Sequence, residues 1–303
     1  MKEIMVSDAA RADWLEKRRK GIGGSDAAVI AGLSPWKSAY SLWVDKVHGA
    51  TTPSSEVMEW GNRLEPVIFE HYAKQTGREI SPGTEMVFSE QHPFLYANTD
   101  GFITAERDGK PFDEGVGILE IKTSARKSDW DTHPPAYYLC QVQHYMLVHD
   151  LQWADFAVLF NGREFKTYRV DRNDDFLESY VRQARHFWDL VESQTPPESM
   201  GGSWAQEEAN ALAHAFPGDV FLNAIELDEA TVESHIALTE LKARKKTLLD
   251  EIKSHENAIK RFMGDHTTGL LPDGSSYSLN RVHRGEYTVN ARSYRELRYR
   301  KSR

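Results

Sequence analysis

Apolar residues along the chain follow two spacings, one typical of strands and one typical of helices. Runs of β-prone residues predict strands over 79–88, 95–104, 117–123, 153–160 and 165–170. Helical spacing, often ended by Gly or Pro, predicts helices over 8–20, 39–47, 54–75, 135–148 and 174–192. The order of these elements predicts an α/β fold in which helices flank a central mixed sheet.

The pattern changes after Thr195-Pro196-Pro197, where we expect the α/β core to end. The residues that follow are rich in Gly, Ser, Ala and Glu, a composition typical of a linker. We therefore expect three parts: a core domain at 1–197, a linker at 198–220 and a C-terminal appendage at 221–303.

The appendage carries a heptad-like pattern, broken by Lys245 and His255, over about four heptads. Its a and d positions hold Leu238, Leu241, Leu248, Ile252, Ile259 and Phe262. This pattern predicts one long amphipathic helix or a short helical hairpin. Beyond it, the turn residues of 271–274 predict a small β-hairpin with strands over 277–282 and 287–289.

One apolar, strand-like run contains charged residues that need an explanation. In Ile118-Leu119-Glu120-Ile121-Lys122, Glu120 and Lys122 share one face of the strand, while Leu119 and Ile121 face a packed layer on the other side. The Glu-x-Lys pattern also occurs at 164–166, 240–242 and 251–253. Those three pairs lie on an open strand face or in a charged helix, where solvated surface is the better interpretation.

Asp100 lies in the preceding predicted strand, 95–104, and a hairpin with its turn at 107–110 would bring it next to Glu120. Two carboxylates with a nearby lysine can hold a divalent metal and activate water for attack. Oxygen ligands suit Mg²⁺ or Mn²⁺ and favour hydrolysis of a phosphodiester. The arrangement indicates a nuclease.

Two helices add further candidates. Glu65 interrupts an apolar stripe formed by Met58, Gly61, Ile68 and Tyr72, so it either reaches the metal site or sits at the edge of the stripe beside a cation. Gln141 and Tyr145 are four residues apart and share one helix face. His144 points elsewhere, and we expect it at the surface.

A glycine-rich stretch, Gly21-Ile22-Gly23-Gly24-Ser25, lies between two helices, with Arg19 just before it. Close backbone approach, a helix N-terminus capped by Ser25 and a cationic side chain would form a phosphate pocket. The alternative is a simple turn between helices. Basic clusters at 17–20, 126–127 and 292–303 are either local DNA contacts or solvated faces.

Composition narrows the class of protein. The 303 residues are 40% hydrophobic and 27% charged, enough for a full core. A net charge of −9 argues against a protein that coats DNA, and one cysteine, Cys140, excludes intrachain disulfides and four-cysteine metal sites. No apolar run suits a membrane span or a secretory signal, so we expect a cytoplasmic location.

The constellation as a whole resembles the PD-(D/E)xK nuclease superfamily, and most closely its YqaJ-like viral recombinase family, which includes lambda exonuclease. The resemblance covers roughly residues 11–197 and rests on Glu65, Asp100, Glu120, Lys122, Gln141 and Tyr145 and on the glycine-rich opening. It implies a restriction-endonuclease-like core, with a C-terminal helical and small β appendage outside the resemblance. Thr99 stands where the superfamily pattern has proline.

The resemblance also implies an activity and a site. It implies a 5′→3′ exonuclease on linear double-stranded DNA, phage- or prophage-encoded, that leaves 3′ overhangs for a single-strand annealing protein and commonly forms a trimeric ring. The implied metal ligands, for Mg²⁺ or Mn²⁺, are Asp100, Glu120, the Ile121 carbonyl and Glu65. Lys122 would orient and deprotonate water, Gln141 would hold the site with support from Tyr145, and Arg19 and Ser25 would bind the 5′-phosphate.

Alternatives remain open at this stage. A structure-specific or restriction-type endonuclease of the same fold would share every acid, and a non-catalytic DNA-binding module would use the fold without the chemistry. Lys122 could act as a general base if its pKa is depressed, or stay charged and stabilise the transition state.

Overall fold

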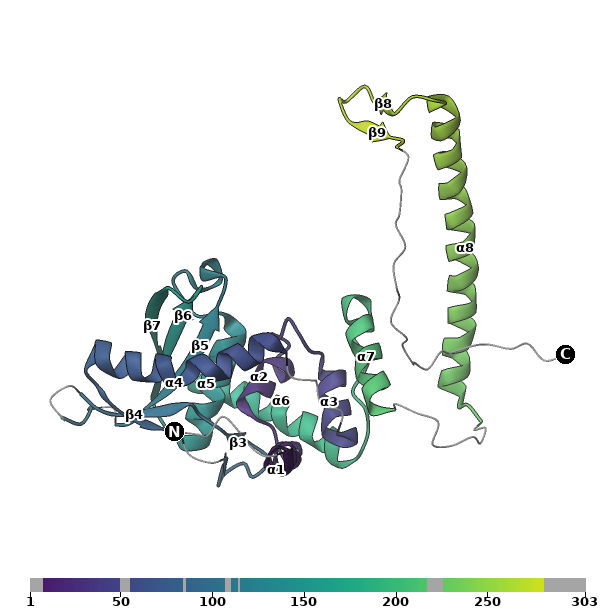
Figure 1. Cartoon of the computed structure of the whole chain (residues 1–303). Coiled ribbons are helices and arrows are strands. Elements are labelled where there is room, and N and C mark those ends of the chain that lie inside the picture. The colour runs from purple at the N-terminus through teal and green to yellow at the C-terminus, as the bar shows by residue number, and fades with distance from the viewer. Residues whose placement is uncertain are drawn as a thin grey trace. The chain divides into compact units, whose positions relative to one another are not determined.

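The computed structural model describes residues 8–49, 55–83, 86–106, 110–113, 115–216 and 226–280. The chain divides into two compact units, Met1–Pro217 and Gly218–Arg303 (Figure 1). No helix in these described ranges combines the length and apolar character needed to cross a bilayer.

The first unit is built on a five-stranded mixed sheet in the order β1-β4-β5-β6-β7. Only β5 and β6 pair in parallel, and the other neighbours are antiparallel. The strands are β1 (Glu79–Pro82), β4 (Gly101–Ala105), β5 (Gly117–Ser124), β6 (Trp153–Phe160) and β7 (Glu164–Asp171). The predicted α/β fold with a central mixed sheet is confirmed.

Helices cover both faces of this sheet. On one face, α4 packs Ile68 and Tyr72 against Leu119 and its neighbours, and Figure 1 shows α4 crossing the strands. On the other face lies a larger core, formed with α2, α3, α5 and α6. The helices of this unit are α1 (Asp8–Arg19), α2 (Gly24–Ile30), α3 (Ala39–His48), α4 (Glu56–Thr76), α5 (Ala136–His149), α6 (Asp174–Glu192) and α7 (Ala205–Ala215), with short 3₁₀ turns η1 (Lys127–Trp130) and η2 (Gly202–Trp204).

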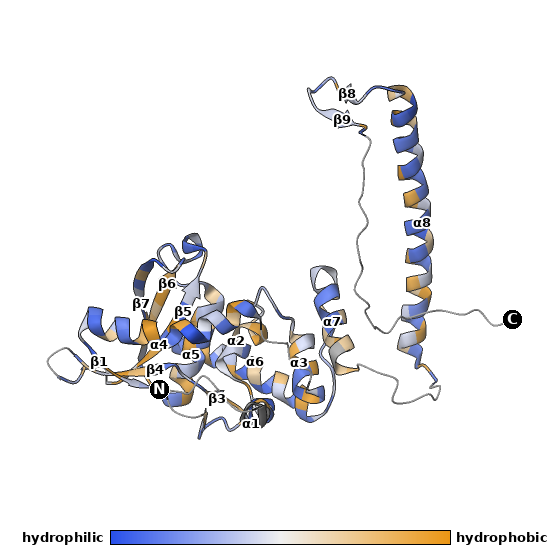
Figure 2. Ribbon diagram, in the orientation of Figure 1, coloured by the Kyte–Doolittle hydropathy of each residue, from blue (hydrophilic) through white to orange (hydrophobic). Residues whose placement is uncertain are grey.

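Strand β6 is mostly apolar because both faces of the sheet are covered there (Figure 2). The two predicted strands at 79–88 and 95–104 are each broken in two, which corrects the sequence prediction. The C-terminal end of the first, β2 (Val87–Phe88), pairs with the N-terminal end of the second, β3 (Tyr96–Ala97), as a separate two-stranded sheet. The first of these strands breaks at Pro82-Gly83. Pro82 has no backbone N–H to donate to the neighbouring strand, and Gly83 packs directly against the backbone of Thr99.

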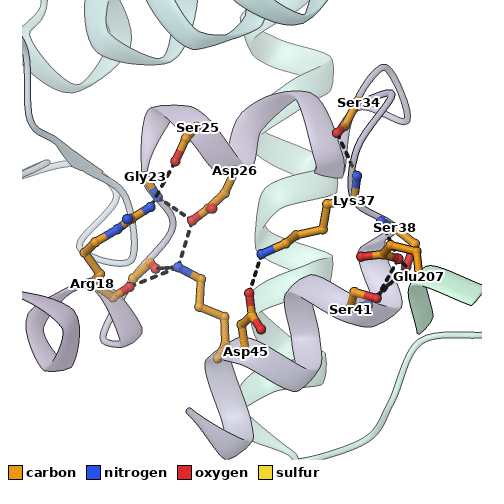
Figure 3. Close-up of polar contacts among 12 residues, drawn as sticks. Arg18, Gly23, Ser25, Asp26, Ser34, Lys37, Ser38, Ser41, Asp45 and Glu207 are labelled. Atoms are coloured by element: carbon orange, nitrogen blue, oxygen red, sulfur yellow. Dashed lines mark hydrogen bonds and ion pairs between the residues drawn. The ribbon is translucent and has the colours of Figure 1, made fainter. Parts of the chain in front are cut away.

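The prediction of a linker at 198–220 is corrected, because part of this segment forms helix α7, which packs on α3. The first unit therefore extends to Pro217. Glu207 accepts hydrogen bonds from the Ser38 hydroxyl at 3.0 Å and the Ser41 hydroxyl at 2.7 Å, at the N-terminus of α3 (Figure 3). The composition is linker-like, but the Glu207 carboxylate at a helix start and the packing of Ala211 and Ala215 on the larger core hold the segment against the first unit.

The second unit contains one long helix, α8 (Glu229–Met263), and a hairpin of β8 (Thr268–Leu270) and β9 (Ser276–Ser278). The predicted turn at 271–274 is present, but its strands lie immediately on either side of it, because the turn pairs the residues that flank it. The predicted strand at 287–289, the end of 277–282 and the basic cluster at 292–303 lie outside the described residues.

One buried group beside the larger core was expected at the surface. His144, expected at the surface, is fully buried between the Tyr180 hydroxyl at 2.7 Å and the Tyr96 carbonyl at 2.8 Å. Burial lowers its pKa to about 4, so the ring is neutral at pH 7. Cys140, on the same helix α5, is also buried.

A buried ion pair ties the first three helices together. Lys46 Nζ, on α3, donates to Asp26 Oδ2 at 2.7 Å and to the carbonyls of Arg18 and Gly21 at 2.9 and 2.7 Å. Burial alone would raise the pKa of Asp26, but the charges of Lys46 and Arg18 outweigh it and lower that pKa. The pair holds the end of α1, the glycine-rich turn and the start of α2 in one place.

We predict that Lys46→Met lowers the free energy of unfolding by about 3–5 kcal/mol, because it leaves the Asp26 carboxylate buried without a cation. Urea unfolding at pH 7 measures this. The control is Lys20→Ala, which removes an exposed pair with Glu16 and should cost less than about 0.5 kcal/mol. Equal small effects of the two substitutions would contradict the role assigned to the buried pair.

Candidate active site

The antiparallel pairing of β4 with β5 brings Asp100 to Glu120. Gly101 lies opposite Leu119, so Asp100, one residue before β4, reaches the next part of β5. Its Oδ2 atom accepts a hydrogen bond from the Ile121 backbone nitrogen at 2.8 Å. The structure therefore contains the hairpin contact that the sequence predicts.

Glu120 is the centre of a side-chain network and is only 2% exposed. Its Oε1 atom accepts from Lys122 Nζ and from Gln141 Nε2, both at 2.7 Å. Gln141 also donates to the Tyr145 hydroxyl at 3.0 Å, so the predicted i, i+4 pair on α5 is in contact. The second oxygen, Glu120 Oε2, is buried and has no hydrogen-bond partner among the described residues.

This environment shifts two pKa values. Burial, followed by repulsion from Asp100, raises the pKa of Glu120 to about 8, and Glu65 adds to the rise despite the contact with Lys122. Burial would lower the pKa of Lys122, but Glu120 and Asp100 outweigh that effect and raise it. Asp100 and Glu65 thus act on the pKa of Glu120 in the opposite direction to Lys122.

Glu65 joins the same site from the other side of an open cavity of about 460 Å³. Ile68 and Tyr72, further along α4, are buried, whereas Met58 is 57% exposed. The apolar stripe predicted for this helix thus packs on the sheet only in its C-terminal half, and its N-terminal half lines the cavity. The cavity is also lined by Arg18, Gly23, Gly24, Ser25, Asp100, Glu120, Ile121, Lys122, Tyr138, Gln141 and Tyr145.

The structure corrects one predicted residue of the phosphate pocket. Arg19 points away and donates to the carbonyls of Lys46 and Val47 at 3.4 and 3.1 Å. Arg18 instead lines the cavity and donates to the Ser25 hydroxyl at 3.1 Å, as Figure 3 shows. The phase of helix α1, rather than proximity in sequence, decides which arginine faces the cavity.

The glycines next to Arg18 have a packing role. A Cβ atom at Gly24 would lie 2.3 Å from the Tyr145 ring, and one at Gly23 would lie 2.6 Å from the Tyr96 ring. Gly23, rather than Ser25, is the N-cap of α2, and its backbone nitrogen donates to Asp26 Oδ2 at 3.1 Å. Glycine is therefore needed because the turn lies directly on two buried tyrosines.

Sequence reasoning missed Arg18, Asp26 and Lys46. Asp26 carried a usable signal, since an acid at the third position of a short helix often bonds back to the N-cap nitrogen. Lys46 carried none, because a lysine near the end of an amphipathic helix is ordinarily solvated.

The residues present fit a divalent cation. No three His, Cys, Asp or Glu side chains in the described ranges converge into a complete metal site. Mg²⁺, however, is usually held by one or two carboxylates together with waters and substrate phosphates. Asp100 and Glu120 supply such a pair, and the buried Glu120 Oε2 atom, which has no hydrogen-bond partner among the described residues, suits coordination to a cation.

Of the four Glu-x-Lys pairs, all in described parts of the chain, only Glu120 and Lys122 line this cavity. Glu164 is exposed and pairs with Lys127 at 2.6 Å, and the remaining two pairs lie on the exposed surface of α8. Asp155, upstream of Glu164, is buried with Tyr72 and Arg78, at 2.7 and 2.6 Å.

Comparison with known proteins places these residues in a family. Residues 13–152, which include every candidate side chain, match the YqaJ-like viral recombinase domain. The uncharacterised protein YqaJ of Bacillus subtilis is 31% identical over 274 residues, which are 88% of this chain and 82% of that protein.

Solved structures share the fold. An alkaline exonuclease from Laribacter hongkongensis has a TM-score of 0.50 at 19% identity, covering 67% of this chain and 100% of its own. The same exonuclease in complex with dAMP has a TM-score of 0.50 at 20% identity and the same coverage. The α/β core thus shares the fold of this exonuclease. By its sequence the chain belongs to the YqaJ-like viral recombinase family.

Proposed function

We propose that this protein is a metal-dependent exonuclease that digests one strand of linear double-stranded DNA in the 5′→3′ direction and leaves a 3′ overhang. The observation that carries the proposal is the group of Glu65, Asp100, Glu120 and Lys122 around one open cavity. Family membership and a fold shared with an alkaline exonuclease support DNA as the substrate.

Asp100 and Glu120 would hold Mg²⁺ or Mn²⁺, with Glu65 and the Ile121 carbonyl as further oxygen ligands. A bound divalent ion supplies Lewis-acid stabilisation of the phosphate and lowers the pKa of water. The negative charge that the carboxylates accumulate is the physical reason to expect such an ion, because like charges in a buried site are costly unless a cation balances them.

The side chains around this site have separate tasks in the proposal. Lys122 would orient the attacking water and, as an ammonium, stabilise charge on the phosphate. Gln141 holds the Glu120 carboxylate in place, and Tyr145 in turn holds Gln141. The 3′ oxygen of the broken phosphodiester bond takes up a proton from solvent.

Arg18 and Ser25 form the proposed pocket for the 5′-phosphate, in place of Arg19 and Ser25. A guanidinium is suited to this task because it stays charged and presents several donors to phosphate oxygens. The Tyr96 hydroxyl accepts from Arg18 Nε at 3.3 Å, and Trp14 lies under the guanidinium at 4.7 Å from the ring centroid. Both contacts orient the arginine before DNA arrives.

By family resemblance we also propose that the 3′ overhang passes to a single-strand annealing protein and that three copies of the chain encircle the duplex. An endonuclease on the same fold is the competing function. A closed circular substrate distinguishes the two, because it has no 5′ end.

We predict that the wild-type protein with Mg²⁺ degrades a 5′-phosphorylated linear duplex from its 5′ end and leaves closed circular DNA intact. EDTA should abolish the reaction, and Lys122→Ala should slow it by roughly 10²–10³-fold because charge stabilisation is lost. Gel analysis of end-labelled strands measures this. Cutting of the circle would move the assignment to an endonuclease, and no reaction with either DNA would favour a binding module.

We predict a pH-dependent difference in stability between Glu120→Gln and the wild type, both in EDTA. Glu120 has a pKa of about 8 when folded and about 4.5 when unfolded, so the unfolded chain loses its proton first as pH rises. Wild-type stability therefore falls relative to Glu120→Gln between pH 5 and 8 and levels off above pH 8. Urea unfolding at several pH values measures it, and a difference independent of pH would refute the raised pKa.

We predict that Arg18→Gln raises the KM for 5′-phosphorylated duplex about tenfold or more and removes the preference over a 5′-hydroxyl duplex, because a charged hydrogen bond to the phosphate is lost. Arg19→Gln is the matched control, one residue away, and should leave the preference unchanged. Initial rates on the two duplexes measure both variants. A loss of preference in Arg19→Gln alone would restore the original assignment.

A further inference from the structure

An exposed tryptophan lies beside the cavity and is not explained by the proposed chemistry. Trp36, in the turn between α2 and α3, is 60% exposed. Its ring meets Tyr137 edge-on at 4.6 Å between centroids and lies 6.4 Å from Tyr138. Tyr137 and Tyr138 are themselves 4.5 Å apart. We call Trp36, Tyr137 and Tyr138 the aromatic platform.

The turn that carries Trp36 is held firmly although its ring is exposed. The Ser34 hydroxyl oxygen accepts from the backbone nitrogens of Trp36 and Lys37, both at 3.2 Å, and Leu33 and Ser34 donate to the Ala28 carbonyl at 2.8 and 3.0 Å. Figure 3 shows Ser34 at this turn and the ion pair of Lys37 with Asp45. A pre-ordered ring loses little conformational entropy when a ligand stacks on it.

The aromatic platform is continuous with the candidate active site. Tyr138 lines the cavity, and Lys122 Nζ lies 4.9 Å from the centroid of its ring. Behind it, the buried Trp130 packs against Tyr138 at 5.2 Å and fixes the ring. The rings therefore lead from the lysine beside the reacting phosphate outward to the surface.

An aromatic surface beside a phosphate-binding cavity fits one class of ligand best. Every nucleobase has a π-face, and stacking on Trp or Tyr is tolerant of sequence, as a nuclease that digests any DNA requires. Unpaired bases next to the scissile phosphate have exposed faces, whereas paired bases are already stacked. A phosphate at Lys122 would place its attached base within reach of Tyr138 and its neighbours.

Resting on the proposed function, we propose that the aromatic platform is a stacking subsite for unpaired nucleobases of the DNA strand that enters the cavity. Trp36 supplies the exposed face, and the two tyrosines set its orientation. The subsite would hold the separated strand near Lys122 and Glu120, and it contributes binding rather than chemistry.

The test uses a 5′-phosphorylated duplex whose first 5′ bases are mismatched and include 2-aminopurine, whose fluorescence falls when the base stacks. Binding is measured with Ca²⁺ in place of Mg²⁺, and digestion of the same DNA is measured with Mg²⁺. We expect Trp36→Ala to weaken binding of the mismatched end roughly tenfold and to remove the fluorescence change. Trp36→Phe should retain most of both, because it keeps an aromatic face.

Leu33→Ala is the matched control, since Leu33 is 47% exposed on the same turn but has no ring to stack, and it should behave as wild type. Trp36→Ala should keep the wild-type melting temperature, because the ring is exposed. The proposal is overturned if Trp36→Ala binds like wild type, or if it changes only the oligomeric state, which would make the platform a protein contact. With either of these results, digestion of DNA by the wild-type protein would still support the proposed exonuclease function. Wild-type protein that neither binds nor digests DNA would overturn both the stacking subsite and the exonuclease function.

Discussion

The burial of the Glu120 carboxylate is the constraint on which the arrangement of this site depends. An ionised carboxylate away from water is costly unless donors or cations surround it, and here one oxygen is bound by Lys122 and Gln141 while the other has no partner among the described residues. The strand that carries it is held between an antiparallel neighbour and a parallel one, so the group cannot move out to solvent. The fold thus buries a carboxyl group whose pKa is raised, at a place where a bound cation would favour its ionised form.

A second buried charge organises the opposite wall of the cavity. Asp26 and Lys46 join the end of α1 to the start of α2, and the ammonium also binds the carbonyl of Arg18. Because both neighbours of the turn are fixed, Arg18 projects toward Ser25 and the cavity, while Arg19 binds the end of α3. Two buried ionic groups, one on the sheet and one between helices, therefore set the geometry of a single open cavity.

The aromatic platform has a similar basis. Its outer ring is exposed, yet its turn is fixed by backbone hydrogen bonds and its inner ring rests on the buried Trp130. Rigid surroundings make exposed side chains useful for binding, because side chains that are already ordered lose little conformational entropy when a ligand binds. The charged and aromatic parts of the cavity differ in chemistry but share this pre-ordering by the core.

The sequence by itself determined the groups whose partners are close in the chain or follow from a regular period. Strand alternation placed Glu120 and Lys122 on one face, and helical spacing paired Gln141 with Tyr145. Only the tertiary structure decided which arginine faces the cavity, since adjacent helical residues point about 100° apart and the phase of a helix is set by what it packs against. The tertiary structure also decided that a linker-like segment docks as a helix, because Glu207 in this segment meets a helix start more than 160 residues away in the chain.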